Sequence, residues 1–289
     1  MNSFKYSVIL ICVLLMNCGV QQDIDVQGHR GCRGLMPENT LEAFKTAIAL
    51  GVNTLELDVV VSKDGKVVVS HEPFISRTYC LDILGNNIPK GLDKSYNLYA
   101  MPYDSIKQFD CGSKFYPKFP DQQKLKTFKP TLDEVIKLSI LNSPDIKFNI
   151  EIKSKPEYDN IYTPNPKDFV SLVLKVVNDN AVVNSVNLQS FDLRVLEEIK
   201  QQQPEIEIAL LVDENEAILD KLSKLSFVPD IVSPYYKLLD AKMVENLQTE
   251  FFKVIPWTVN DTKDLKQMLR FGVDGIITDY PNRLIELLK

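Results

Sequence analysis

The chain has no block of basic residues, and its 289 residues carry a formal net charge of −6. Proteins that bind nucleic acid need clustered Lys and Arg side chains, because these displace counterions from the phosphates. The composition therefore argues against nucleic acid as a partner. A substrate that carries a phosphate would need local help from a few cationic side chains or from a metal ion.

The N-terminal apolar run is too short to span a bilayer comfortably. It covers residues 6–16, which is the length of a signal-peptide core. We therefore predict that residues 1–17 are a signal peptide, that they take no part in the fold, and that the protein is exported.

The end of this run suggests how the exported protein is held. Leu15-Met16-Asn17-Cys18 resembles a bacterial lipobox, in which the Cys is lipidated and becomes the mature N-terminus. We expect lipidation of Cys18, a lipid-anchored linker at 18–25 and a place on the periplasmic or outer-membrane face of a bacterial cell envelope. Because Asn17 is unusual before that Cys, cleavage by an ordinary signal peptidase is the alternative.

Cysteine is scarce after the predicted signal peptide and Cys18. Cys32, Cys80 and Cys111 remain, an odd number for an exported protein. Cys80 and Cys111 share one weakly periodic segment and could form a disulfide, which would leave Cys32 free. Three buried reduced thiols are the alternative.

Apolar strand-like runs alternate with amphipathic segments along the rest of the chain. Runs typical of buried parallel strands lie at about 27–30, 54–58, 148–152, 185–189, 206–211, 230–233, 253–257 and 274–278. Helical periodicity lies at about 40–50, 131–140, 166–178, 192–200, 214–224, 239–247, 261–270 and 282–288. Eight strands alternating with eight helices predict one TIM-type (β/α)8 barrel over residues 26–289.

The alternation fails after the second strand, where a hairpin and an insertion intervene. Two valine triplets flank Asp64-Gly65, the strongest short-range turn signal. If the hairpin is symmetric about that pair, Asp58 lies directly opposite His71. Residues 73 to about 125 then form an insertion whose aromatic residues and cysteines favour an ordered lid over the barrel mouth.

Three acidic residues are expected at the carboxyl ends of neighbouring strands. Glu56 and Asp58 are two positions apart and so face the same way, and Glu151 lies on the next barrel strand with Lys153 on its face. Buried carboxylates are costly unless they bind a cation. A set of three carboxylates favours Mg²⁺ or Ca²⁺ over Zn²⁺. Solvated acids paired with Arg30 and Lys153 are the alternative.

The chain has two histidines, and both are expected at the same rim. His29 follows the first strand and His71 follows the hairpin. Either one alone would more often be a structural residue than a catalytic one. Their joint placement beside three acids, on the face where barrel enzymes carry their active sites, favours catalysis.

A set of motifs, in order and spacing, resembles the glycerophosphodiester phosphodiesterase family within the PLC-like phosphodiesterase superfamily. The resemblance runs from about residue 26 to the C-terminus. It rests on Gly28-His29-Arg30-Gly31, Pro37-Glu38-Asn39-Thr40, Glu56-Leu57-Asp58-Val59, Lys63-Asp64-Gly65, Val68-Val69-Ser70-His71-Glu72, Glu151-Ile152-Lys153, Gln189-Ser190-Phe191, Trp257-Thr258-Val259-Asn260 and Gly272 to Asp279. This sequence departs from the pattern at Glu72, where Asp is commoner, and at Cys32 inside the first motif.

The resemblance implies roles for individual residues. His29 and His71 would be the acid/base pair, while one divalent cation, Mg²⁺ or Ca²⁺, would be held by the three acids. Further residues would contact the substrate phosphate or its surroundings or wall the glycerol pocket, namely Arg30, Glu38, Lys153 and Trp257. Gln189 ends another strand at this rim, where substrate contact and barrel packing are equally good interpretations.

The reaction implied is hydrolysis of glycerophosphodiesters, such as glycerophosphocholine or glycerophosphoethanolamine, to glycerol 3-phosphate and an alcohol. Two alternatives stay open. One is a phosphodiesterase of the same fold that acts on phosphoinositides or lysophospholipids. The other is a non-catalytic surface lipoprotein that binds lipid headgroups or glycans, although such a protein need not keep both histidines and all three acids.

Overall fold

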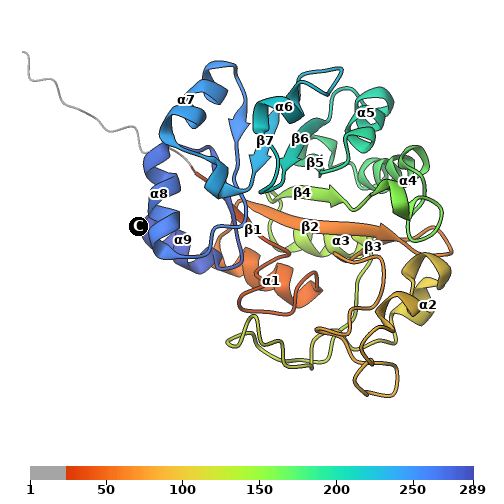
Figure 1. Ribbon diagram of the computed structural model, residues 1–289. Helices are drawn as coiled ribbons and strands as arrows, with labels where there is room; N and C mark the ends of the chain where they lie inside the picture. The colour runs from red at the N-terminus through yellow and green to blue at the C-terminus, as the bar shows by residue number, and fades with distance from the viewer. Residues whose placement is uncertain (1–23) are drawn as a thin grey trace, which may run out of the picture.

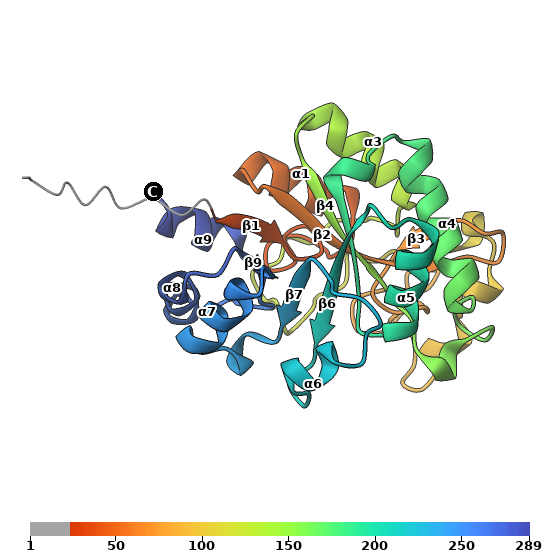
Figure 2. The same cartoon turned by 90° about the horizontal axis from the view of Figure 1, so that it is seen from above.

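The computed structural model describes residues 24–289 and shows a barrel of parallel strands surrounded by helices (Figure 1, Figure 2). The strands are β1 Asp25–Gly28, β2 Thr54–Val61, β3 Val67–Val69, β4 Lys147–Ile152, β5 Val186–Ser190, β6 Glu207–Val212, β7 Ile231–Pro234, β8 Lys253–Val254 and β9 Gly275–Thr278. Their order in the sheet is β8-β7-β6-β5-β4-β2-β1-β9, and β3 pairs with β2 from outside this path.

Backbone hydrogen bonds bring the two ends of the sheet together. The amide of Asp274 donates to the carbonyl of Val254 over 3.0 Å, and that of Ile277 donates to Pro256 over 3.0 Å. Strand β8 is shorter than the predicted run 253–257, since Pro256 has no N–H to donate to a ladder. Eight parallel strands thus form a nearly closed barrel, and the prediction of a (β/α)8 fold is confirmed.

The helices follow the predicted segments closely. They are α1 Leu41–Leu50, α3 Leu132–Asn142, α4 Pro166–Asp179, α5 Leu193–Gln202, α6 Ile218–Leu222, α7 Ala241–Thr249, α8 Thr262–Phe271 and α9 Pro281–Leu287. Thr131 and Glu134 form a reciprocal capping box at the start of α3. Helix α6 is shorter than the predicted 214–224, because residues 213–216 fold into a turn in which the Glu216 side chain accepts from the Asp213 amide.

The core has two layers. Most buried apolar side chains lie between the strands and the surrounding helices. A small cluster inside the barrel contains Ala209, Ile231, Ile255 and Ile277, with Trp257 packed against it. Polar side chains also lie inside the barrel: Asn187 Nδ2 donates to Asn149 Oδ1 over 2.6 Å, and Asn149 Nδ2 donates to Gln27 Oε1 over 2.8 Å.

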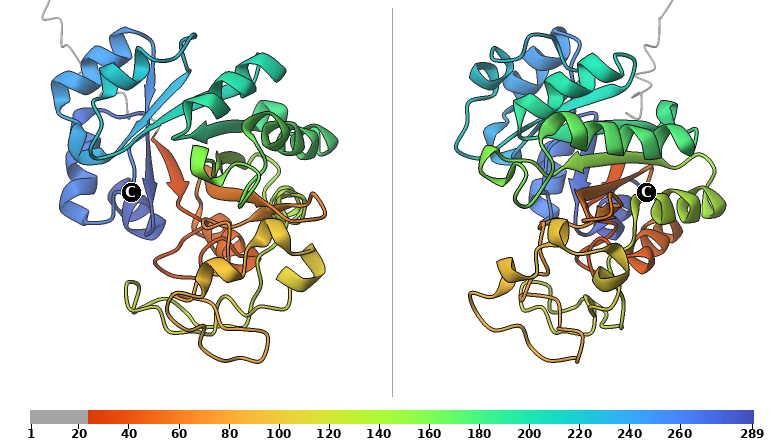
Figure 3. Two further views of the ribbon diagram at one scale, coloured as in Figure 1. Left: turned by 45° about the vertical axis from the view of Figure 1, so that its right-hand side comes forward. Right: turned by 90° about the vertical axis from the view of Figure 1, so that its right-hand side faces the viewer.

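The insertion packs as a subdomain of its own on one flank of the barrel, beside the β2–β3 hairpin (Figure 3). It contains α2 Tyr103–Ile106, and its buried residues form a separate apolar cluster with Val60 and Val68 of the hairpin. The expectation of a lid over the mouth stays a prediction, because this cluster shows only that the insertion packs against the hairpin. Lys118 does reach the cavity at the mouth.

Of the three cysteines after the predicted signal peptide and Cys18, two form a disulfide and one is free, which is the first of the two alternatives. Cys80 and Cys111 form a disulfide with Cα atoms 4.0 Å apart. Cys32 is free and fully buried, and its thiol points at the Ala43 carbonyl over 3.3 Å. The predicted signal peptide, Cys18 and most of the predicted linker lie outside the described residues. Within 24–289, no helix is both long and apolar enough to cross a membrane.

The register of the β2–β3 hairpin corrects one prediction. Val59 pairs with Val69 and Val61 with Val67, so Asp58 faces Ser70 rather than His71. The amide of Ser70 donates to the carbonyl of Asp58 over 2.9 Å.

The turn explains this shift of one residue. A two-residue turn of the kind expected needs positive φ at both central residues, and here Gly65 has φ 75° while Asp64 is not among the residues with positive φ. Asp64 instead accepts hydrogen bonds from the Ser62 hydroxyl over 2.7 Å and from the Tyr103 amide over 2.9 Å. The loop is therefore three residues long, with Asp64 at its tip.

Candidate active site

The three predicted acids meet at the carboxyl ends of two adjacent strands. Asp58 of β2 and Glu151 of β4 are register partners, and Glu56 lies two residues earlier on the same face. All three are buried, and each offers a carboxylate oxygen within 4.8 Å of the others. The parallel pairing of β2 and β4 thus brings the three acids together, as the sequence spacing predicts, and it places them where water has little access.

The charges in this cluster are not balanced by protein alone. Burial, then Asp58 and Glu151, raise the pKa of Glu56 well above its usual range. Burial also raises the pKa of Glu151 to about 7, although Lys153 opposes this. Burial would raise the pKa of Asp58 as well, but Arg30 and other cationic neighbours hold it well below its ordinary value.

Two cations partly neutralise the acids. Arg30 Nε lies 3.3 Å from Asp58 Oδ2, and Lys153 Nζ lies 2.6 Å from Glu151 Oε1 and 3.7 Å from Asp58 Oδ1. Three carboxylates against two cations leave an excess of negative charge, which a divalent ion would neutralise. The donors are all carboxylate oxygens, the ligand type that Mg²⁺ and Ca²⁺ prefer, so the residues present fit such an ion.

His29 is held by a partner from the last strand. Its Nδ1 lies 2.6 Å from Oδ1 of Asp279, which directly follows β9. Burial and the nearby Arg33 lower the pKa of His29 to about 4, while Asp279 opposes them. The imidazole is therefore neutral at pH 7, with its proton on the nitrogen that faces the carboxylate and Nε2 as the acceptor.

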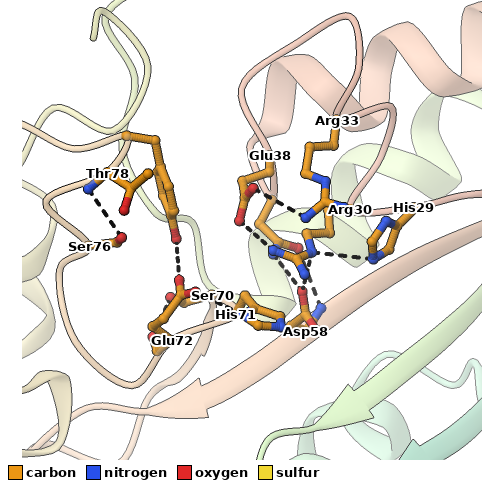
Figure 4. Close-up of polar contacts among 12 residues, drawn as sticks. His29, Arg30, Arg33, Glu38, Asp58, Ser70, His71, Glu72, Ser76 and Thr78 are labelled. Carbon is orange, nitrogen blue, oxygen red and sulfur yellow. Dashed lines mark hydrogen bonds and ion pairs between the residues drawn. The ribbon is translucent and has the colours of Figure 1, made fainter. Parts of the chain in front are cut away.

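His71 is held in the same way by its neighbour in the chain. Its Nδ1 lies 2.9 Å from Oε1 of Glu72, and the ring lies between Glu72 and Asp58 (Figure 4). Burial, Arg30 and Lys153 lower the pKa of His71 below its usual range. Although Asp58 does not face His71 across the ladder, β3 ends at Val69, and the chain that follows brings the imidazole back toward the acids.

Four further residues were predicted to contact or surround substrate, and the structure places three of them on the cavity. Arg30, Lys153 and Trp257 line a cavity of about 230 Å³ together with both histidines, whereas Glu38 lies behind Arg30 and accepts from its Nη1 over 2.7 Å. Trp257 packs edge-on against Phe191, with ring centroids 5.4 Å apart.

Gln189 also lines this cavity. Its Nε2 donates to Glu56 Oε1 over 3.1 Å, while its buried Oε1 has no hydrogen-bond partner in the described protein. A buried acceptor without a partner is costly, so a water molecule or a ligand hydroxyl is the expected donor.

A larger groove of about 850 Å³ opens beside the cavity. The two share His71, Glu151 and Lys153, and the groove continues past aromatic and apolar side chains that include Phe74 and Tyr158. His71 and Glu151 therefore stand between a small polar cavity and a wide groove. That arrangement suits a substrate with two unequal parts joined at a central charged group.

The family model for glycerophosphoryl diester phosphodiesterases matches residues 29–283. The chain belongs to this family. A glycerophosphodiester phosphodiesterase from Caldanaerobacter subterraneus subsp. tengcongensis is 32% identical to it over 264 residues, which is 91% of this chain and 97% of that relative. The predicted family resemblance is thereby confirmed.

Solved structures of the family share the fold. One from Silicibacter pomeroyi, assigned to the glycerophosphoryl diester phosphodiesterases, has a TM-score of 0.83 at 30% identity and covers 92% of both chains. A phosphodiesterase from Oleispira antarctica, in complex with the product sn-glycerol-3-phosphate, has a TM-score of 0.72 at 23% identity. It covers 91% of this chain and 95% of its own, and at that identity the likeness shows the fold.

Two residues have contacts at the site that the sequence did not assign to them, although Asp279 ends one of the motifs that resemble the family. Asp279 orients His29. Arg33 in turn donates to Asp279, from Nε to Oδ1 over 2.8 Å and from Nη2 to Oδ2 over 3.1 Å. The available signal was the position of Asp279 immediately after a strand, where barrel enzymes keep functional groups. No comparable signal marks Arg33, which lies in the loop after β1.

Proposed function

We propose that this chain hydrolyses glycerophosphodiesters, such as glycerophosphocholine and glycerophosphoethanolamine, to glycerol 3-phosphate and an alcohol. The observation that carries the proposal is that two imidazoles, each bound at Nδ1 to a carboxylate, border one cavity beside a cluster of three buried acids, two of which line it. Family membership and the glycerol 3-phosphate complex of the Oleispira antarctica phosphodiesterase support it.

The charged residues would bind and activate the phosphodiester. Glu56, Asp58 and Glu151 would hold one Mg²⁺ or Ca²⁺ ion, which supplies Lewis-acid charge to the phosphoryl oxygens. Arg30 and Lys153 line the same cavity and would place their cationic groups toward these oxygens. Stabilising charge that develops in the transition state is worth about 2.7–4 kcal/mol for one well-placed donor.

The two histidines would move the protons. One imidazole accepts the proton of the attacking hydroxyl and the other donates to the departing alcohol, and each transfer is worth roughly 10²- to 10⁴-fold in rate. Attack by the substrate's own glycerol hydroxyl would give a cyclic phosphate, which water then opens. The imidazole that acts as the acid must carry a proton at Nε2 before the alcohol departs. The roles reverse when water opens the cyclic phosphate: that imidazole accepts a proton from water, and the other returns its proton to the glycerol oxygen.

The small cavity and the wide groove would bind different parts of the substrate. The small cavity, walled by Trp257 and Phe191, suits the glycerol side. The wide groove suits the leaving alcohol, so headgroups of different size can be accommodated.

The test is a coupled assay for glycerol 3-phosphate with purified residues 19–289, added Mg²⁺ or Ca²⁺ and a panel of glycerophosphodiesters. Lysophospholipid and phosphoinositide substrates belong in the same panel, because they report the alternative specificities. His29→Ala and His71→Ala should each abolish turnover, whereas Lys175→Ala on the exposed face of α4 should not. A flat trace with every metal and every substrate would refute the enzymatic proposal.

We also propose that the protein is an exported lipoprotein anchored through Cys18. The support is the apolar run at 6–16 that ends in the lipobox-like sequence. Membrane fractionation of the full-length chain should place the wild type with membranes, and Cys18→Ala should release it or block processing. A soluble wild type would overturn the anchor and leave the enzymatic proposal standing.

A further inference from the structure

Glu72, the carboxylate that holds His71, has partners on both of its oxygens. Oε1 accepts from His71 Nδ1 over 2.9 Å, and Oε2 accepts from the Tyr79 hydroxyl over 2.7 Å. The Tyr79 oxygen in turn accepts from Lys129 Nζ over 3.3 Å. Four side chains thus form one line of hydrogen bonds that ends at the imidazole.

The two members of this line that lie furthest from the imidazole are buried. Tyr79 is 6% exposed and Lys129 is 3% exposed. The Lys129 ammonium lies 5.0 Å from the centre of the Tyr79 ring, and the Tyr79 hydroxyl is its hydrogen-bond partner among the described residues. Burying a lysine without a directly paired carboxylate is expensive. Burial lowers the pKa of Lys129, and the negative charges of Glu72 and Glu38 oppose this shift.

We propose that Tyr79 and Lys129 are positioning residues for His71, and the inference rests on the proposed function of that histidine. The hydroxyl of Tyr79, polarised by the ammonium of Lys129, holds Glu72 in the orientation that receives the Nδ1 proton. The imidazole is thereby kept in one tautomer and one rotamer, with Nε2 free for proton transfer. A base oriented by a third group is the general arrangement of activated catalytic pairs.

The other histidine has an equivalent support of different chemistry. His29 is held by Asp279, and Asp279 is gripped directly by Arg33 through two hydrogen bonds. Each imidazole is therefore followed by a carboxylate and then by a buried cation. For His71 the cation is one residue further away, and a tyrosine bridges the gap.

The inference assigns a role to the insertion. Tyr79 belongs to it, and the next residue, Cys80, is bonded to Cys111. Lys129 lies just after the insertion, two residues before Thr131, which is the N-cap of α3. The subdomain would therefore act on the reaction through the tyrosine that it holds against Glu72, in addition to bordering the cavity with Lys118.

The test compares Tyr79→Phe with Tyr103→Phe. Both tyrosines are buried and both donate to a carboxylate over 2.7 Å, but Tyr103 bonds Glu134 at the start of α3, with the backbone carbonyl of Lys129 as a longer contact at 3.3 Å. We expect kcat of Tyr79→Phe to fall roughly 10- to 100-fold, the range for losing one hydrogen bond to a charged group. KM and metal affinity should stay within about twofold, since no contact to the acids is removed, and Tyr103→Phe should lose stability without losing kcat.

The tautomer of His71 can be measured by NMR, and it would not change if Tyr79 only stabilised the fold. The chain has two histidines, so ¹⁵N-histidine NMR of a protein free of a histidine tag resolves both rings. The wild type should show His71 protonated at Nδ1, and Tyr79→Phe should show a mixture of tautomers. This measurement needs no turnover, so it tests the inference even if the proposed substrate is wrong.

A second variant guards against misfolding. Lys129→Met removes the charge and keeps the length of the side chain, and Lys129→Arg restores the charge. We expect Lys129→Met to lower kcat, as Tyr79→Phe does. We expect Lys129→Arg to have a higher kcat than Lys129→Met. An unchanged His71 spectrum in Tyr79→Phe, or a kcat equal to that of Tyr103→Phe, would overturn the inference.

Discussion

The Nδ1 atom of His29 and the Oδ1 atom of Asp279 lie 2.6 Å apart although 250 residues separate them in the chain. The link exists because β1 and β9 are neighbours in the barrel, with Gly28 opposite Thr278. Both residues stand one position beyond that pair. The closing of the barrel is therefore also what orients the first histidine.

Asp279→Asn should lower kcat by roughly 10²- to 10⁴-fold, the range of a misoriented acid/base group. The amide oxygen accepts the Nδ1 hydrogen bond more weakly than a carboxylate does, and the amide NH2 group can donate to Nδ1 instead, so the other tautomer becomes accessible. Steady-state kinetics would measure the loss.

Asp264→Asn is the matched control for that variant, because its carboxylate accepts from Tyr236 over 2.9 Å away from the cavity. It should leave kcat unchanged. Equal kinetics in both variants would contradict a role for Asp279 in orienting His29.

Metal binding should weaken as the pH falls below about 7. Burial raises the pKa of Glu151 to about 7, so below that pH a proton occupies a carboxylate that the ion needs. Calorimetric titrations with Mg²⁺ or Ca²⁺ at pH 6, 7 and 8 would measure this. Affinity that stays constant across this range would contradict the assigned ligand.

The raised pKa of Glu151 also predicts how the stability of the metal-free protein changes with pH. The folded pKa of Glu151 lies above its unfolded value of about 4.5, so its contribution is fully present below pH 4.5 and is lost as the pH rises through 7. In EDTA, the wild type should therefore lose stability relative to Glu151→Gln between pH 4.5 and 7. The free energy of unfolding of both proteins would be measured by denaturation at several pH values. If the difference between them stayed constant from pH 4.5 to 7, the pKa of Glu151 would not be raised in the folded protein.

The strands, the helices and the convergence of the three acids could be predicted because they follow from local periodicity. Two carboxylates two apart on a strand must share a face, and parallel strands end at a common rim. The partnership of His29 with Asp279 follows from barrel closure, which sets which strand ends touch. No spacing within the sequence encodes that contact directly.

The hairpin register and Lys129 escaped prediction for a different reason. The turn signal at Asp64-Gly65 is local, but the Asp64 side chain is bound by the Tyr103 amide from the insertion, and this contact favours the longer loop. Lys129 has no polar neighbour in the sequence to mark it, and its partner Tyr79 lies 50 residues away. Tertiary contacts decided both features.

Gly65→Ala tests the three-residue turn. Gly65 has φ 75°, and a Cβ atom added there meets nothing within 4 Å, so the substitution costs only backbone strain. We expect a loss of about 1–2 kcal/mol in the free energy of unfolding, and a smaller loss for Gly65→Asn, which tolerates this conformation. Urea denaturation would measure both, and equal stability of Ala and wild type would contradict the turn geometry.

Removal of the disulfide should loosen the insertion before it unfolds the barrel. The Cys80–Cys111 bond closes a loop with a sequence separation of 31, and such a cross-link stabilises by about 3–4 kcal/mol. The insertion has its own small apolar cluster, whereas the helices pack on the separate and larger barrel core. A Cys80→Ala/Cys111→Ala variant should therefore keep its helical circular dichroism while residues 73–125 exchange amide hydrogens faster.

Activity should report the same event, because Tyr79 sits next to Cys80. When the insertion loosens, the Tyr79 hydroxyl leaves Glu72, and kcat should fall toward the value of Tyr79→Phe. Dithiothreitol should act on the wild type as the double substitution does. Cys32→Ala is the control, since that thiol is buried and unbonded to other cysteines, and its response to reductant should match the wild type. A reduced protein with full turnover and unchanged exchange in residues 73–125 would show that the disulfide does not support the active site.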